Sequence, residues 1–419
     1  MYSNRRSFLK FLCKTVVSAS LPVFLSRKAL GDPRRIIIGM IEPLTGPYAL
    51  FGAESRDGAL LALEQINREG GVLGSKLELR WYDFDQPQKA YQYALRLSRN
   101  DGALAIIGPS TNASSNIVIS NLAEKDRIPF LISNSFTEEA FDVETNFTFR
   151  ILPGINLVAE QSLSYLSEIS SKIGVSIRTI SLFWRELSVI NKSIHHFKRV
   201  ATEKGFQINF DYPFTGSPDF HSTLERVKRL DTDILVFNGG LLNAINLTKK
   251  MRELKAFPKA VVGFSTLAFS NPAFVARMDN LFLNVMDANY WWNPKLGASA
   301  RLKKDFFQKY KKPLSNNALN AYTAIYTFGD AIRKSGVASR ERLASELRKG
   351  IFRNHTFAQK GPIQFDERGR NINATSVLLQ VMNPVPKVIY PGPFSEAEPF
   401  FMLGRRMRLN EWEQAKLML

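Results

Sequence analysis

Apolar runs alternate with amphipathic stretches along the first third of the chain. Arg35 to Ile41 is rich in β-branched residues, which predicts a buried strand. From Ser55 to Arg68 the apolar residues recur at helical spacing, and Gly70-Gly71 ends that helix. Further strands are predicted at 77–82, 103–107 and 129–132, and further helices at 89–99 and 113–125. A repeat of this kind forms a parallel sheet with helices on both faces.

The alternation restarts near residue 179, which predicts a second unit of the same kind. Strands are predicted at 179–183, 206–210, 234–237 and 260–263, and helices at 192–203, 220–230 and 243–255. The remaining pattern predicts strands at 281–286, 361–365 and 376–381, and helices at 298–309, 317–335 and 339–349. The fold class is therefore α/β, with two doubly wound units.

The first 31 residues have the pattern of an export signal. The paired arginines Arg5-Arg6 precede an apolar stretch at 15–25, and small residues precede a cleavage site after Gly31. The arginines resemble a twin-arginine signal, with Asn4 where Ser or Thr is usual. An uncleaved anchor is the alternative, but this stretch has only half of the roughly 20 residues that span a bilayer. We predict a periplasmic protein cleaved after Gly31.

The net charge does not alter the prediction of an exported protein. The 419 residues carry a formal charge of +18, and removing 1–31, which hold six basic and no acidic side chains, lowers it to +12. The basic residues are scattered, so we expect no nucleic-acid binding, and the basic surface favours an anionic solute, an acidic partner or lipid head groups. The basic amphipathic tail at 404–419 either packs on the surface or contacts a partner or lipid.

The reactive side chains do not form an enzyme pattern. The only cysteine, Cys13, lies in the export signal, so the mature chain has no thiolate nucleophile and no disulfide. No nucleophile elbow or phosphate-binding glycine loop occurs. The histidines lack a second ligand at metal spacing: His195, His196, His221 and His355. We therefore expect no enzyme activity, no catalytic residue, no metal and no cofactor.

Candidate binding residues lie in six loops, because ligands of open α/β sheets bind beyond the carboxyl ends of the strands. Two of these loops, 108–115 and 133–138, are rich in Ser, Thr and Asn and lead into helical stretches. They either hold a polar ligand group at a helix start or act as ordinary helix caps. Aromatic residues near the loops either line an apolar wall or belong to the core. The other loops are 42–52, 184–190, 238–243 and 264–270.

Several motifs, in order, resemble those of leucine/isoleucine/valine-type periplasmic solute-binding proteins, the type I binding proteins of ABC importers. They are Glu42-Pro43-Leu44-Thr45-Gly46-Pro47, Phe51-Gly52, the glycine-rich turn at 67–74, Tyr82-Asp83, Ile107-Gly108-Pro109 and the segment 360–369. The resemblance covers roughly residues 34–400. It implies two Rossmann-like doubly wound lobes joined by a three-segment hinge, with solute in the cleft between them.

The resemblance also implies the limits of the lobes. The first would hold 32–150 plus 287–377, and the second 151–286 plus 378–403. The chain would then cross between the lobes near Arg150, near 284–287 and near 376–379. The signal peptide at 1–31 and the tail at 404–419 lie outside both lobes.

The loops and the resemblance together give ten candidate ligand-binding residues. Asn112 stands where the family has a carboxylate-binding Ser, and Thr137 stands where it has a ligand-binding Thr. The second lobe lacks the acid that pairs with an ammonium group, and burying an ammonium without a carboxylate is costly. We therefore expect a small carboxylate or amide rather than a free α-amino acid. The ten residues are Phe51, Ser110, Asn112, Ser135, Phe136, Thr137, Trp184, Ser188, Leu241 and Ser265.

The function that the resemblance implies is delivery of a small organic solute, amino-acid-like or a carboxylate or amide, to an ABC permease and ATPase complex in the inner membrane. The protein would act as a monomer and would not be an enzyme. A ligand-sensing subunit of a periplasmic signalling system has the same fold and is the alternative.

Overall fold

The computed structural model describes residues 35–110, 113–136, 138–142, 145–266, 268–382 and 385–402. The predicted signal at 1–31 and tail at 404–419 lie outside these ranges, as do Asn112 and Thr137. Residues from Arg35 onward form one compact unit. Within the described ranges, no helix is both long enough and apolar enough to cross a membrane.

The first lobe is built on a five-stranded parallel sheet with the order β2-β1-β3-β4-β5. Ile38, Met40 and Ile106 are fully buried, as expected for strands covered on both faces. Its strands are β1 (Arg35–Glu42), β2 (Lys76–Asp83), β3 (Ala105–Ile107), β4 (Phe130–Ile132) and β5 (Thr148–Arg150). The helices between them are η1 (Gly46–Tyr48), α1 (Ala49–Arg68), α2 (Pro87–Arg99), α3 (Ala113–Asp126) and η2 (Glu139–Phe141).

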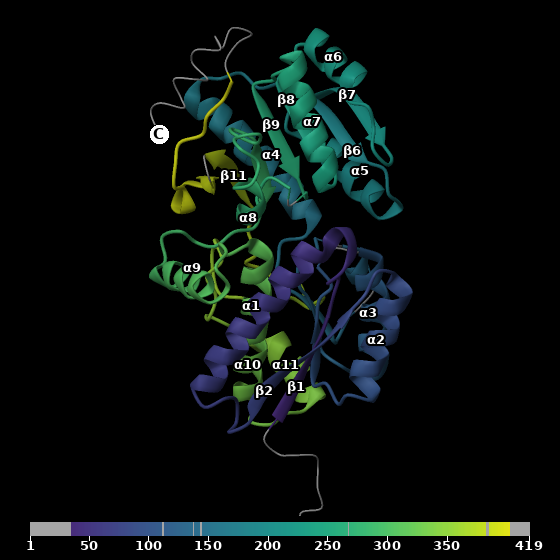
Figure 1. Ribbon diagram of the computed structural model, residues 1–419, viewed down its shortest axis with the longest axis vertical. Coiled ribbons are helices and arrows are strands. Elements are labelled where there is room, and N and C mark those ends of the chain that lie inside the picture. Colours follow the sequence, from purple (N-terminus) through teal and green to yellow (C-terminus); the bar gives the residue numbers. More distant parts are fainter. Residues whose placement is uncertain are drawn as a thin grey trace, which may run out of the picture. The chain divides into compact units, whose positions relative to one another are not determined.

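Three helices from later in the chain complete this lobe. They are α9 (Gly297–Tyr310), α10 (Asn316–Ser335) and α11 (Arg340–Lys349). Helix α10 packs along α1, and the two run side by side in Figure 1. A Cβ at Gly58 would lie 2.1 Å from the carbonyl oxygen of Ala318, so the glycine allows the two helices to approach this closely.

The second lobe is built on a seven-stranded sheet with the order β12-β11-β10-β9-β8-β6-β7. The strands from β7 to β10 are parallel, while β11 and β12 pair antiparallel. They are β6 (Thr179–Arg185), β7 (Gln207–Phe214), β8 (Ile234–Asn238), β9 (Ala260–Phe264), β10 (Met286–Asn289), β11 (Val377–Met382) and β12 (Val385–Tyr390). The helices are α4 (Ile155–Ile173), α5 (Ser188–Glu203), α6 (His221–Arg229), α7 (Leu241–Leu254), α8 (Pro272–Val275) and η3 (Gly392–Phe394).

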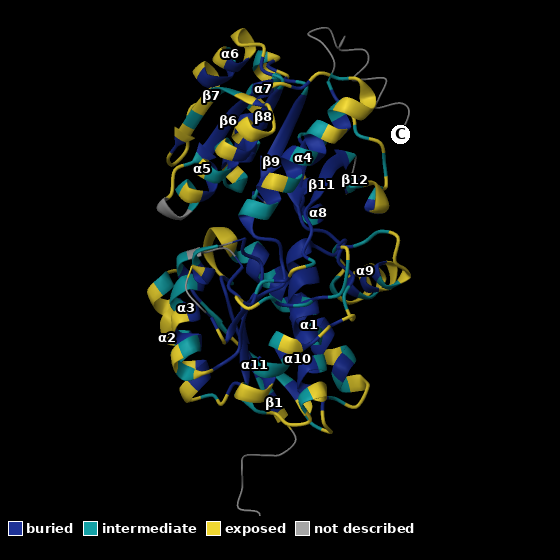
Figure 2. Ribbon diagram, turned by 180° about the vertical axis from the view of Figure 1, so that it is seen from behind, coloured by how far each residue is buried: buried dark blue, intermediate teal, exposed yellow. Residues whose placement is uncertain are grey.

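Burial follows the layer pattern. Strands β8 and β9 are buried along their whole length and are dark blue in Figure 2, whereas β7 carries exposed residues. Phe183, Phe220 and Phe237 belong to an aromatic cluster that fills the core beside β8. Such large side chains supply much of the buried apolar area of the lobe.

The chain passes between the two sheets three times, after β5, after β10 and before β11. Strand β10 pairs with β9 from Met286 to Ala288, so the predicted limit at 286/287 falls inside a strand of the second sheet. The division into lobes at those residue numbers stays a prediction.

Two predicted strands are wrong. At 281–286 only Met286 is in a strand, because the preceding segment turns, with positive φ at Asp279, Asn280 and Asn284. At 361–365 only single bridges form, from Ile363 to Phe352 and from Phe365 to Asn371. Strands β5 and β12 and helix α4 are present but were not predicted.

Candidate functional site

The loop between β1 and α1 is fixed by a carboxylate at the end of β2. The backbone N–H of Leu44 and the hydroxyl of Thr45 each donate to Asp83, both at 2.7 Å. This anchoring places the start of α1, which carries the candidate residue Phe51.

One face of the first turns of α1 is buried and polar. Phe51, Glu54 and Ser55 are 8%, 1% and 0% exposed. Residues three and four apart share a helix face, so Glu54 and Ser55 lie on the side of α1 that carries Phe51. Their hydrogen bonds show what this face meets.

Glu54 meets a loop of the second lobe. The carboxamide of Asn271 donates to both oxygens of Glu54, at 3.0 and 2.8 Å, and that of Asn317 donates at 3.1 Å. Asn271 follows β9, and its side-chain oxygen caps α8 by accepting from the N–H of Phe274. Burial raises the pKa of Glu54, against the effect of these amide donors. Within the described residues Glu54 forms no ion pair.

Ser55 meets the loop after β4. The carboxamide of Asn134 donates to the hydroxyl of Ser55 at 2.7 Å, and its oxygen accepts from the hydroxyl of Tyr290 at 2.7 Å. Tyr290 directly follows β10, at the second crossing, and its ring lies 5.8 Å from that of Phe136. A hydrogen-bonded path therefore runs from α1 through a candidate binding loop to the hinge.

Glu42, the last residue of β1, holds two candidate loops together. It accepts from the backbone N–H of Ser110 at 2.9 Å and from the hydroxyl of Ser133 at 3.2 Å. Burial raises the pKa of Glu42 to about 7, although these hydrogen bonds oppose the shift. The ends of β1, β3 and β4 are thus tied to one carboxyl group.

The second lobe has its own buried carboxyl group, at Asp287 on β10. Asn289 donates to Ser270 at 2.8 Å and, more weakly, to Asp287 at 3.4 Å. Burial raises the pKa of Asp287 to about 7. Asp287 lies opposite Gly263 of β9, where a Cβ would come within 2.5 Å of the carboxylate. The carboxyl group therefore fits only because residue 263 has no side chain.

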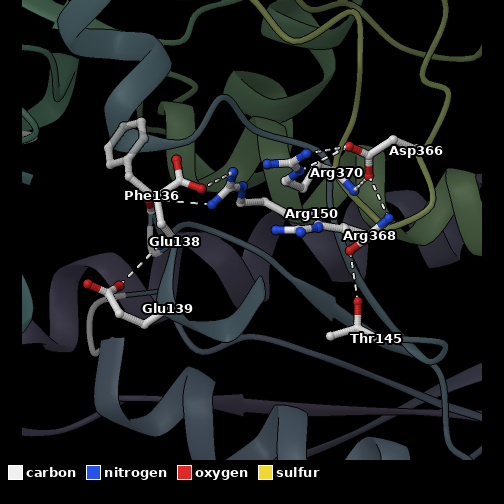
Figure 3. A network of polar contacts seen from close by, with 8 residues as sticks. All are labelled: Phe136, Glu138, Glu139, Thr145, Arg150, Asp366, Arg368 and Arg370. Atoms are coloured by element: carbon white, nitrogen blue, oxygen red, sulfur yellow. Dashed lines mark hydrogen bonds and ion pairs between the residues drawn. The ribbon is translucent and has the colours of Figure 1, made fainter. Parts of the chain in front are cut away.

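A buried arginine supports the loop 133–138 at the first crossing (Figure 3). Arg150 is 3% exposed and donates to Glu138 at 3.2 Å and to the carbonyl oxygen of Phe136 at 3.5 Å. Its guanidinium also lies 4.9 Å from the ring centre of Phe141. Burial lowers the pKa of Arg150, and the charge of Glu138 opposes that shift.

The first-lobe candidates that the structure describes are buried, three of them in loops after β3 and β4 and Phe51 in the first turn of α1. Phe51, Ser110, Ser135 and Phe136 are all less than a tenth exposed. Ser110 is held by Glu42, and Phe136 is held through its carbonyl by Arg150. Their contact with a solute remains a prediction.

The second-lobe candidates are more varied. The indole N–H of Trp184 donates to Asp211 on the neighbouring strand at 2.7 Å. Leu241 and Ser265 are half-buried, and Ser265 has a φ of 56°. Ser188 begins α5, but its side chain lies outside the described part of the chain. These assignments also remain predictions.

Sequence reasoning missed the buried acids. Glu42 lay in a motif that was used only for the resemblance, and Glu54 directly precedes the helix predicted at 55–68. Asp287 follows directly after a predicted strand. An acid directly beside an apolar strand or helix is the signal that identifies such positions, because an unpaired charge is seldom buried without a reason.

Two cavities occur elsewhere in the described part of the chain. One of about 280 Å³ lies in the second lobe and is lined by Val275, Ala276, Asp279, Asn280, Phe282, Leu283 and Val381. A void of about 10 Å³ lies at the crossings, beside Ile151, Tyr290, Trp291 and Thr375. Neither is lined by any of the ten candidate residues. The smaller one has the volume of a single water molecule at most.

Two doubly wound sheets joined by three crossings define a two-lobed α/β protein. The model of the periplasmic binding protein family matches residues 35–383. The chain belongs to this family. As such it is a solute-binding protein.

Relatives and solved structures agree with this family. The chain is 24% identical over 337 residues to the leucine-, isoleucine-, valine-, threonine- and alanine-binding protein of Pseudomonas aeruginosa, covering 80% of this chain and 86% of the relative. A Desulfitobacterium hafniense substrate-binding protein in complex with Leu matches with a TM-score of 0.71 and 21% identity, over 85% of this chain and 100% of that one. A Rhodopseudomonas palustris solute-binding protein in complex with benzoate matches with a TM-score of 0.70 and 15% identity, over 85% and 95%.

Proposed function

We propose that the chain is the extracytoplasmic binding component of an ABC importer and that it holds one small organic solute against the first turns of α1. The observation that carries this proposal is the meeting of loops from both sheets on that helix. Asn134, after β4, contacts Ser55, while Asn271, after β9, contacts Glu54. A solute held there would touch both lobes and so favour the form in which they are close together.

The solute class that we propose is amino-acid-like or a carboxylate or amide. The relatives support this breadth, since one is named for five amino acids, one solved structure holds Leu and another holds benzoate. The ten candidate residues are proposed to line the site, with Phe51 covering the solute. The partners would be an inner-membrane permease and ATPase, and the protein would act as a monomer after twin-arginine export and cleavage following Gly31.

The test is the melting temperature of residues 32–419 with a panel of amino acids, aliphatic acids, aromatic acids and short amides. A solute that binds only the folded state adds about 2.7 kcal/mol of stability at a hundred times its Kd, which shifts the midpoint by several degrees. We expect such a shift with at least one member of the panel. Shifts limited to the aliphatic acids, aromatic acids and amides would support the expectation that the second lobe lacks an acid to pair with an ammonium group, whereas a shift with leucine would contradict it. No shift with any solute would overturn the proposal.

A further inference from the structure

Two hydrogen bonds join Glu54 of the first lobe to Asn271 of the second. Helix α1 packs on β1, β2 and α10 of the first lobe, whereas Asn271 starts α8, which packs on β12 of the second. Asn271 is fully buried and Glu54 nearly so. The two amide–carboxylate bonds therefore join the lobes in a place shielded from water.

Two other direct contacts between the lobes are exposed. Arg185 donates to the hydroxyl of Tyr48 at 3.4 Å, and Lys192 pairs with Asp142 at 3.3 Å with both side chains more than half exposed. Exposed pairs of this kind contribute little and are screened by salt. Hydrogen bonds to a buried charged group are stronger, and removing one partner leaves the other group unsatisfied. The buried pair therefore dominates over these surface contacts.

We propose that the Glu54–Asn271 pair is a positioning contact that sets how tightly the protein holds its solute without touching the solute. The inference rests on the proposed function. Both oxygens of Glu54 are engaged by protein amides, from Asn271 and Asn317, so the carboxylate acts through the loop after β9. When only the form with the lobes together binds tightly, the observed Kd equals the intrinsic Kd divided by the population of that form. Weakening the pair lowers that population and raises the Kd of every solute by the same factor.

The first arm of the test is affinity. Glu54→Gln and Asn271→Ala should each raise Kd about tenfold, since a tenfold change corresponds to the loss of one charge-assisted hydrogen bond. The factor by which Kd rises should be the same for two solutes of different classes that bind, such as an amino acid and an aromatic acid. The double variant Glu54→Gln/Asn271→Asp exchanges the amide and the carboxylate, and it should restore affinity to within about threefold, because the introduced glutamine then donates to a carboxylate. The matched control is Asn317→Ala, which removes a donor to Glu54 inside the first lobe. It should leave Kd within about twofold.

The second arm measures the lobes themselves and needs no solute. Residues 32–419 contain no cysteine, so Lys125→Cys on α3 and Lys204→Cys after α5, both exposed, accept spin labels specifically. The label-to-label distance distribution should shift or broaden in Glu54→Gln and should return in the exchange variant.

An unchanged distance distribution in Glu54→Gln would overturn the inference. So would a loss of affinity for only one class of solute, which would make Glu54 a ligand contact. If the distance changes in Glu54→Gln but no solute in the panel binds, the pair does hold the lobes together and the proposed function is wrong. Failure of this inference can therefore be distinguished from failure of the proposed function.

Discussion

The two lobes differ in how the loops at the carboxyl ends of their strands are held. In the first lobe, Glu42 ties the loops after β3 and β4, and Asn134 ties the second of these to α1. In the second lobe the helices α5 and α7 begin within a few residues of their strands, and Leu242 at the start of α7 is 72% exposed. The first edge is fixed by a buried carboxyl group shared between two loops, whereas at the second edge the carboxamide of Asn238 joins the ends of β8 and β9 by donating to the carbonyl oxygen of Phe264. We therefore expect the largest effect on stability where a buried charged side chain of the first lobe is removed.

The largest expected effect lies at Arg150, the support of the first-lobe loop 133–138. Arg150→Ala should destabilise the protein by about 3–5 kcal/mol, because it removes a buried guanidinium and leaves Glu138, whose side chain is 22% exposed, without its partner. Urea unfolding measures the loss. The matched control is Arg370→Ala, whose partner Asp366 and own side chain are partly exposed, with an expected loss of less than about 1 kcal/mol. Equal losses in the two variants would show that the buried pair does not organise this lobe.

The pH dependence of stability compares the acids of the two lobes. The pKa values of Glu42 and Asp287 are both raised to about 7 by burial, from 4.5 and 3.8. A raised carboxyl pKa means that the native state binds the proton more tightly than the unfolded state, so stability rises as pH falls from about 7 toward 4.5. Each group contributes between about 3 and 4 kcal/mol over that range, at about 1.4 kcal/mol per pKa unit. The unfolding free energy at a series of pH values measures this slope.

Replacing each acid by its neutral amide shows how much of the pH dependence of stability comes from each lobe. Glu42→Gln and Asp287→Asn should each flatten part of it. Glu42→Gln should also weaken solute binding, because Gln presents only one acceptor oxygen to Ser110 and Ser133. A rise in stability with pH between 5 and 7 that both variants abolish would contradict the assigned directions.

The sequence predicts a helix or strand correctly where the pattern that indicates it lies within the element itself. Strands such as 234–237 and helices such as 317–335 follow from periodicity, and the structure confirms them as β8 and α10. The short strand β5 has only three residues, too few for a period to show, and it is held by its neighbours β4 and Gly369. The wrong strand at 281–286 arose because a short run of apolar residues in a turn has the same pattern as a short buried strand.

The candidate site was harder to predict because its key bonds join distant residues. Glu54 and Asn271 are 217 positions apart, and Tyr290 and Asn134 are 156 apart. Loop position, together with the resemblance, selected the serine and aromatic candidates, since parallel strands end at one edge. It did not identify which buried acids hold those loops, because a carboxylate inside a helix has no local pattern that gives its distant partner.

A smaller effect is expected at the hinge. Tyr290→Phe removes only the hydroxyl that donates to Asn134, and it leaves a buried amide oxygen without that donor. The expected loss of stability is about 1–3 kcal/mol, measured by urea unfolding. Tyr322→Phe, whose hydroxyl bonds to Gln65 in a partly buried position, is the control and should lose less. If Tyr290→Phe leaves the affinity for solute unchanged, the hydrogen-bonded path does not couple the first-lobe loop to the crossing.

The smallest effect should come from the exposed contact between Arg185 and Tyr48. Tyr48 is 39% exposed and the bond is long, so water replaces it readily. Tyr48→Phe should change stability by less than about 0.5 kcal/mol and Kd by less than about twofold, and raising the salt concentration should alter neither. Binding titrations at low and high salt, together with urea unfolding, measure these quantities against Glu54→Gln. A larger effect at Tyr48 than at Glu54 would reverse the comparison, because closing of the lobes would then depend on their exposed rim rather than on the buried face of α1.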